Sequence, residues 1–255
     1  MNIPSARPLD TAMMIAGLGF GSLAAAEPHP AEELEQLRIN TAYVIEPGEF
    51  EIDIVPSYFD YGDARHHGVE AEFEYAVSER LMLELEVPYH WVSFDGADEN
   101  RDGAGNVEVA AKWLLTDRGS FAVGFNAGLQ LPASDDEPRI AEDSWGAELT
   151  VPMSFHFPDR NMRLHIEPGV EWREHEGFEE QLLNIALEHR PRGCNFALLL
   201  GSNLVREEGD VEAYLIPSFE VAATDVPFQF GMGVAAGLTS ESATWGVLFD
   251  LEVEF

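Results

Sequence analysis

Basic side chains are scarce in this sequence. Its 255 residues contain 14 lysines and arginines against 47 aspartates and glutamates, so the formal net charge at pH 7 is -33, and Lys112 is the only lysine. Because binding to phosphate backbones needs a basic surface, nucleic acid is not expected as a partner. An acid-rich, lysine-poor composition is also typical of proteins kept soluble in high salt, so the charge has two interpretations, function and habitat.

Cysteine and long apolar runs are nearly absent as well. The single cysteine, Cys194, excludes an internal disulfide framework. After the first 26 residues no segment has about 18 consecutive apolar residues, so no transmembrane helix is expected there. Hydrophobic residues nevertheless make up 45% of the chain, which argues against disorder. We therefore expect one folded domain built from segments of mixed polarity.

The N-terminus has the pattern of a signal peptide. Arg7 is followed by an apolar stretch over residues 12–23 and then by Ala24, Ala25 and Ala26. The stretch is too short for a membrane anchor, and small residues before the cut are what a signal peptidase accepts. We predict that residues 1–26 are cleaved after Ala26, an uncleaved anchor being the alternative. Residues 27–48 are then a periplasmic N-terminal segment.

From Glu49 onward the dominant signal is an alternation with period two, which is typical of β-strands. Phe50, Ile52 and Ile54, for example, alternate with Glu51 and Asp53. Such runs begin near Phe50, Val69, Leu81, Val107, Phe121, Trp145, Met162, Gln181, Cys194, Val211, Phe228 and Ala243. They predict about twelve strands over residues 49–255. Prolines 56, 88, 132, 152, 168 and 217 lack a ladder donor and are expected near rims or bulges.

The connections between these runs alternate in character. Short turns, such as Ser78 to Arg80, are predicted at every second connection, and mostly longer acidic loops, such as Phe59 to His67, lie between them. Short periplasmic turns and longer outer loops are typical of outer-membrane barrels. The last alternating run ends at Phe255, the final residue. We interpret this terminal aromatic as a signal for the barrel-assembly machinery, the alternative being ordinary packing at a sheet edge.

Alternation alone does not say which face points inward. In a soluble barrel the apolar face fills the core, and in a membrane barrel the two faces exchange roles. The even number of strands, the alternating connections and Phe255 favour the membrane form. The predicted fold class is all-β, a transmembrane antiparallel up-and-down β-barrel of about 12 strands in the outer membrane, in contact with its lipid.

In that orientation the polar phase of the strands lines the lumen. The residues predicted to line it are Glu51, Asp53, Glu70, Glu72, Glu74, Glu84, Glu86, Glu108, Lys112, Glu148, Arg163, His165, Glu167, Glu188, Glu212 and Glu252. Carboxylates far outnumber cations in this set, so the lumen is expected to favour cations. Small residues on the same phase, including Gly231 and Gly233, are expected to leave space in it.

Several motifs resemble one known family. They are Glu46-Pro47-Gly48-Glu49-Phe50-Glu51, Ser78-Glu79-Arg80-Leu81, Glu86-Val87-Pro88-Tyr89 and the run from Gly103 to Leu115. Together they resemble the outer-membrane family named for the MetA-pathway of phenol degradation, a family of transporters. Asn106 departs from the family pattern, in which Asp is expected. The resemblance implies a barrel and export, and it carries no catalytic residues.

Few motifs suggest chemistry. Ser154 and His156 lie two apart on the polar face, a spacing that could activate a hydroxyl, but no oxyanion-hole signature accompanies them. His66 and His67 beside Asp63, or His165 with Glu167, could ligate a metal, although loop histidines are more often solvated. We predict no enzyme activity, no cofactor and no metal.

The leading functional hypothesis is an outer-membrane channel or transporter for small solutes. A non-conducting structural or binding barrel is the alternative, and a barrel hydrolase comes third. The two leading hypotheses differ in whether side chains or residues 27–48 occlude the lumen. No motif identifies the solute.

Overall fold

The computed structural model describes residues 41–62, 64–94, 100–132, 144–174, 177–207, 210–223 and 227–255. The predicted signal peptide and residues 27–40 lie outside this part of the chain. Among the described residues, no helix is long and apolar enough to cross a membrane. Apart from one 3-10 turn at Pro158–Arg160, the regular structure in this part of the chain is β-strand.

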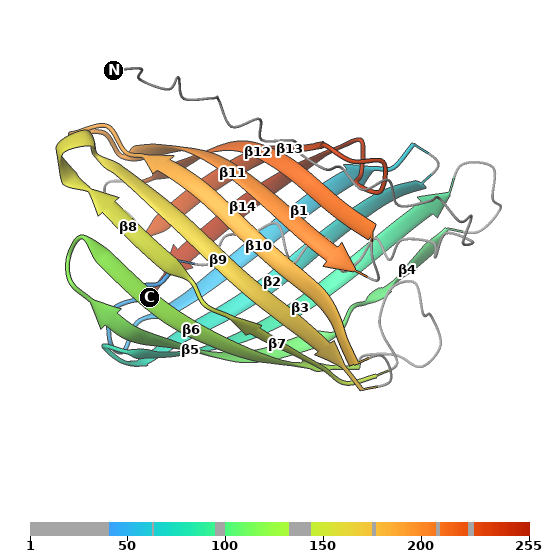
Figure 1. Cartoon of the computed structure of the whole chain (residues 1–255), viewed down its shortest axis with the longest axis horizontal. Helices are drawn as coiled ribbons and strands as arrows, with labels where there is room; N and C mark the ends of the chain where they lie inside the picture. Colours follow the sequence, from blue (N-terminus) through green and yellow to red (C-terminus); the bar gives the residue numbers. More distant parts are fainter. Residues whose placement is uncertain are drawn as a thin grey trace, which may run out of the picture.

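The strands follow the chain in antiparallel order (Figure 1). Their bounds are β1 (Phe50–Asp60), β2 (Ala64–Ser78), β3 (Leu81–Phe94), β4 (Arg101–Ala104), β5 (Val107–Asp117), β6 (Phe121–Leu131), β7 (Gly146–Thr150), β8 (Met153–Phe157), β9 (Met162–Arg173), β10 (Gly177–His189), β11 (Phe196–Glu207), β12 (Asp210–Ala222), β13 (Phe228–Gly237) and β14 (Trp245–Glu254).

These segments occupy twelve positions around a closed barrel. Both β4 and β5 pair with β3, and both β7 and β8 lie between β6 and β9, so each of these two pairs is one interrupted strand. The ring closes where β1 pairs with β14, for example at Asp53 and Glu252. The predicted fold class, an antiparallel up-and-down barrel of twelve strands, is confirmed.

Prolines explain the interruptions. On β3, the pairing with β5 ends at Glu86 and the pairing with β4 begins at Tyr89, so the break brackets Pro88. Pro152 lies between β7 and β8. Proline cannot donate to a ladder, which opens the pairing locally without ending the strand position. Prolines were expected near rims or bulges, and these two lie within the wall, at breaks in the ladder pairing.

The two faces of the wall have opposite character. Along β3, Leu83, Leu85 and Val87 are 46%, 38% and 39% exposed, whereas Glu84 between them is 3% exposed. Glu72 on β2 is 4% exposed, and Lys112, Arg173 and many other acids are also buried. Apolar side chains therefore cover the outside and charged ones the inside, which is the reverse of a soluble barrel.

The two ends of the barrel differ as well. At the end that carries the C-terminus, adjacent strands are joined by tight turns, as between β2 and β3 and between β5 and β6 (Figure 1). We call this the termini end and the opposite one the loop end. One predicted long loop was wrong: β1 and β2 extend through most of Phe59 to His67, so only residues 61–63 connect them. The strands persist there because alternate residues continue to face inward, including Phe59 and His66.

Candidate functional site: the acidic interior

A row of carboxylates crosses five neighbouring strands. The register places Glu252 of β14 beside Asp53 of β1, then Glu72 of β2, Glu86 of β3 and Glu108 of β5, each directly opposite the next. Like charges directly opposite each other on one face of a sheet are destabilising. The row therefore makes one wall of the interior strongly attractive to cations.

A second row lies beside the first, nearer the termini end. Glu51, Glu74 and Glu84 occupy adjacent positions on β1, β2 and β3. The Lys112 Nζ atom lies 3.2 Å from the Glu84 Oε1 atom, and both side chains are almost completely buried. One oxygen each from Glu51, Asp53 and Glu74 lie within 4.8 Å of one another, so these residues could hold a hard divalent cation.

Cationic side chains gather on the opposite wall. Arg163 and Arg190 both contact Glu188, with Nη1–Oε2 and Nε–Oε1 distances of 3.6 and 3.2 Å. Arg190 also reaches Glu220, at an Nη2–Oε2 distance of 3.6 Å. In the ring of twelve positions, β9 lies diametrically opposite β1, and β10 lies opposite β2. Glu167, Glu171, Glu180 and Glu188 are also buried on β9 and β10, so the acidic wall faces one where arginines offset part of the negative charge.

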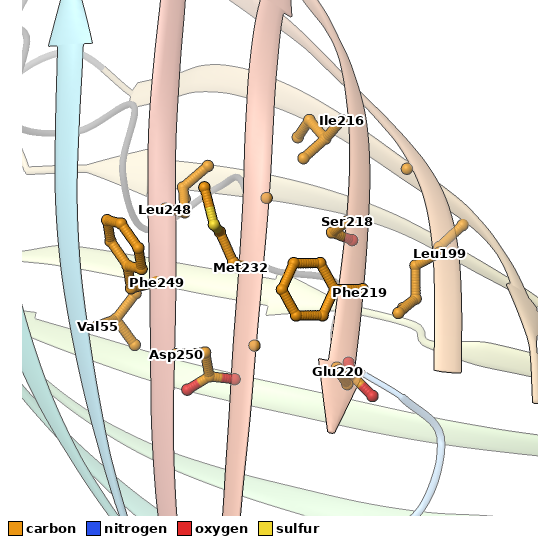
Figure 2. A pocket seen from close by; sticks show the side chains of 14 residues that line it. Val55, Leu199, Ile216, Ser218, Phe219, Glu220, Met232, Leu248, Phe249 and Asp250 are labelled. Carbon is orange, nitrogen blue, oxygen red and sulfur yellow. The ribbon is translucent and has the colours of Figure 1, made fainter. Parts of the chain in front are cut away.

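The described residues border an acidic and a mixed cavity in the interior. The acidic cavity, of about 340 Å³, is bordered by both walls, including Glu72, Lys112 and Arg163. The mixed cavity, of about 200 Å³, is bordered by apolar side chains with two carboxylates, Glu220 and Asp250 (Figure 2). Ala186, Leu199, Glu220 and Asp250 border both cavities. The two spaces therefore adjoin.

Of the described residues before β1, those at 41–45 border the interior of the barrel. Thr41, Tyr43, Val44 and Ile45 border the acidic cavity, and Ala42 is fully buried. We call Thr41–Ile45 the inner segment. A Cβ atom on Gly124 would lie 3.4 Å from the Ala42 Cα atom, so this glycine gives the segment room against the wall. Burial, with the charge of Asp117 as a further cause, raises the pKa of the Tyr43 phenol, which therefore stays neutral.

A hydrogen-bonded relay holds the inner segment. The Ala42 N–H donates to Ser154 Oγ at 3.2 Å, and Ser154 Oγ lies 2.9 Å from His165 Nδ1. The other ring nitrogen of His165, Nε2, lies 3.3 Å from Glu188 Oε2. The histidine that contacts Ser154 is therefore His165 and not His156, whose spacing from Ser154 was weighed in the sequence. The partner of Ser154 lies on the adjacent strand, because β8 pairs with β9 and places His165 opposite it.

The sequence matches one family over most of its length. The family described as MetA-pathway of phenol degradation matches residues 40–237. The chain belongs to this family. The resemblance carried by the turn and strand motifs is thereby confirmed. A comparison with curated protein sequences finds no significant match.

Solved structures with low sequence identity share the fold of this family member. An outer membrane channel from Pseudomonas putida F1 is 11% identical, with a TM-score of 0.67 over 84% of this chain and 98% of that one. The KdgM porin in complex with disordered oligogalacturonate is 10% identical, with a TM-score of 0.55 over 80% and 98%. The β domain of the Bordetella autotransporter BrkA is 10% identical, with a TM-score of 0.52 over 81% and 98%.

The structure places the residues selected from the sequence on one phase of the strands of this family member. Those that border the acidic cavity are Glu51, Asp53, Glu70, Glu72, Glu74, Glu86, Lys112, Arg163, His165, Glu188 and Glu252. Glu84, Glu108 and Glu167 are buried, and Glu148 and Glu212 are half-buried. Phe255 is 69% exposed, and its backbone exchanges two hydrogen bonds with Phe50.

Sequence reasoning missed the apolar part of the interior. Phe59, Tyr214, Ile216, Ala235, Ala243 and Leu248 form a buried cluster on strands β1 and β12–β14 and the connection before β14. The alternation along β1 already indicated these residues, because Val55 and Phe59 lie on the same face as Glu51 and Asp53. His66 and His67 were also misplaced: both lie in β2 and not in a loop, and the His66 ring is buried 5.0 Å from that of His90.

Proposed function

We propose that this chain is a channel for small solutes in the outer membrane, with an interior that favours cations. The supporting observation is the pair of adjoining cavities inside a closed barrel, one of them bordered by rows of carboxylates. Carboxylates around a pore attract cations and repel anions. The arginines on β9 and just after β10 are fewer than the carboxylates of the interior, so the net preference is for cations.

Two features of the outer surface support a position in lipid. The outward face carries leucine, valine and aromatic side chains in place of charges. Four of the five tryptophans, Trp91, Trp145, Trp172 and Trp245, lie near the loop end and are 38% to 47% exposed. Aromatic girdles at the membrane interface are typical of outer-membrane barrels. The loop end is then extracellular and the termini end periplasmic.

Export would proceed through cleavage after Ala26 and insertion by the barrel-assembly machinery. Fractionation tests the location: the mature chain should be recovered in the outer membrane and should migrate differently before and after heating. Recovery as a soluble periplasmic protein would contradict the proposal.

The charge of the interior limits the solutes. The KdgM porin was solved with oligogalacturonate, a polyanion. The acidic rows of this chain would repel such a ligand, so shared architecture does not imply shared cargo. Small cations and polar neutral molecules fit the interior better.

Selectivity can be tested on one strand. Glu70, Glu72 and Glu74 all face inward from β2 and border the acidic cavity. Replacing all three with Gln keeps their volume and removes three ionisable carboxyl groups, so the cation preference, measured as a reversal potential across a salt gradient, should fall. It should also fall in the unmodified protein as salt rises from 0.1 to 1 M, because screening shortens from about 10 Å to about 3 Å.

The control is Glu79→Gln, which removes an exposed charge in the turn between β2 and β3. It should leave the reversal potential unchanged. An anion-selective pore, or equal reversal potentials for the triple variant and the unmodified barrel, would contradict the cation-favouring interior.

The inner segment favours the second candidate, a barrel that does not conduct. Thr41–Ile45 takes up space beside the acidic cavity and is fixed to the wall at Ser154. Conductance of the refolded protein in planar bilayers separates the two candidates. Stable ion currents support the channel, and their complete absence supports the non-conducting barrel.

We further propose that the Ser154 relay is structural and that the chain is not an enzyme. Ser154 is 1% exposed, and its Oγ atom accepts the Ala42 N–H. A nucleophile must reach its substrate, which this hydroxyl cannot do while the inner segment is in place. Hydrolysis of ester substrates by the purified barrel, lost in Ser154→Ala, would overturn this assignment.

A further inference from the structure

The mixed cavity exists because β13 presents glycines to the interior. Gly231 lies between Glu220 and Asp250 on the neighbouring strands, and Gly233 lies between Ser218 and Leu248. A Cβ atom on Gly231 would come within 3.1 Å of the Asp250 Cβ atom. With no side chain on these two residues, β13 forms the floor of a hollow whose sides come from β12 and β14.

The lining of the hollow combines two chemistries. Ile216, Leu199, Val55 and Leu248 present apolar groups, and Glu220 and Asp250 lie together at one end (Figure 2). Ala186 and Ser218 also border the hollow, whereas the alternation of β14 turns the Phe249 side chain, which is 36% exposed, to the outer face. No lysine, arginine or histidine is among the described residues that border this cavity. Arg190 contacts Glu220 but is not part of the lining.

We propose that the mixed cavity binds small organic cations, molecules with one ammonium group on an apolar body. The ammonium would lie at the Glu220 and Asp250 end, where the hydrogen bonds are charge-assisted. The body would lie among Ile216, Leu199 and Leu248, where it replaces water against apolar walls. The inference deepens the proposed channel function by naming a solute class, and it rests on that function.

Size limits the ligand further. The cavity measures about 200 Å³. Since a cavity of about 150 Å³ holds benzene, the hollow accepts one ring or one branched alkyl group with its ammonium. An inorganic cation would gain nothing from the apolar walls, and an anion would be repelled by both carboxylates. Binding in the mixed cavity therefore needs both the ammonium group and the apolar body.

Benzylammonium is a suitable probe because it joins one ring to one ammonium. Its binding to the purified full chain in detergent micelles can be measured by isothermal titration calorimetry. Three comparison compounds each lack one element: benzyl alcohol lacks the charge, methylammonium lacks the ring, and benzoate reverses the charge. We expect saturable binding of benzylammonium, about tenfold or more tighter than that of each comparison compound.

Variants locate the site. Asp250→Asn keeps the volume and removes the charge, and it should weaken benzylammonium binding about tenfold. Ser218→Leu, which fills the hollow, should weaken benzylammonium and benzyl alcohol alike. Glu86→Gln is the matched control, because Glu86 faces the interior but does not border the mixed cavity. Its affinity should stay within about twofold of the unmodified protein.

Equal affinity for benzylammonium and benzyl alcohol would overturn the proposal, because it would indicate partition into apolar space alone. If Asp250→Asn and Glu86→Gln lowered the affinity for benzylammonium equally, the proposal would also be overturned, because the attraction would then come from the whole acidic interior. These measurements need no ion flow. A barrel that binds benzylammonium as expected but does not conduct would contradict the channel function and leave this site in place.

Discussion

Removal of the Ser154 hydroxyl should release the inner segment. In Ser154→Ala the Ala42 N–H loses its acceptor at 3.2 Å, and His165 loses its partner at 2.9 Å. Ala42 is fully buried, so its donor is left without a hydrogen bond unless the segment moves. A buried unsatisfied donor costs about 1–3 kcal/mol, which corresponds to a roughly 5- to 150-fold shift toward the released state.

Two assays measure this shift. Single-channel recordings should show a larger or more frequent high-conductance state, because a released segment no longer narrows the acidic cavity. Maleimide labelling of Ala42→Cys, made in a Cys194→Ser background because Cys194 is exposed, should accelerate by the same factor when Ser154→Ala is added.

Matched controls separate the hydrogen bond from general loosening. Ser154→Thr keeps a hydroxyl and should behave much like the unmodified protein. Ser218→Ala removes an interior hydroxyl that does not border the cavity of the inner segment, so it should change neither readout. Identical conductance and identical labelling rates in Ser154→Ala and the unmodified protein would refute the reasoning.

The remaining predictions concern the wall and assembly. Leu85→Arg places a charge on the outward face and should lower the free energy of unfolding in lipid by about 2–4 kcal/mol if Leu85 lies near the midplane, whereas Glu86→Arg on the inward face should be tolerated, as denaturant titrations can check. Glu84 also faces inward, but it is unsuitable for this control because the arginine of Glu84→Arg would lie beside Lys112 and repel it. Deleting Phe255 should reduce assembled yield far more than it reduces the stability of barrels already folded. Equal losses in yield and stability would indicate that the exposed Phe255 ring matters only through packing against Phe50.

Local rules made much of the barrel predictable. Alternation gave the strands and their number, since a period of two places residues on opposite faces whatever the surroundings are. It also grouped the acids that now border one cavity, such as Glu70, Glu72 and Glu74. Turn residues gave the tight connections at the termini end. Prolines indicated breaks in the pairing but not their place, because a ladder gap within the wall and a rim look alike in sequence.

Side-chain contacts between different strands could not be predicted from alternation and turn residues. Ser154 and His165 are 11 residues apart and meet only because β8 and β9 pair in one particular register. The mixed cavity depends on β13 lying between β12 and β14, which places glycines between two carboxylates. Register and ring closure are set by all the strands together, so no single segment contains them.

By itself, the sequence determined that this chain alternates apolar and acidic residues along about twelve strands that end at Phe255. Only the tertiary structure decided which of the two faces encloses the interior and where the acidic phase gives way to apolar residues such as Val55 and Phe59. The physical reason is that periodicity fixes the spacing of side chains relative to one another. Their direction depends on what surrounds the closed sheet.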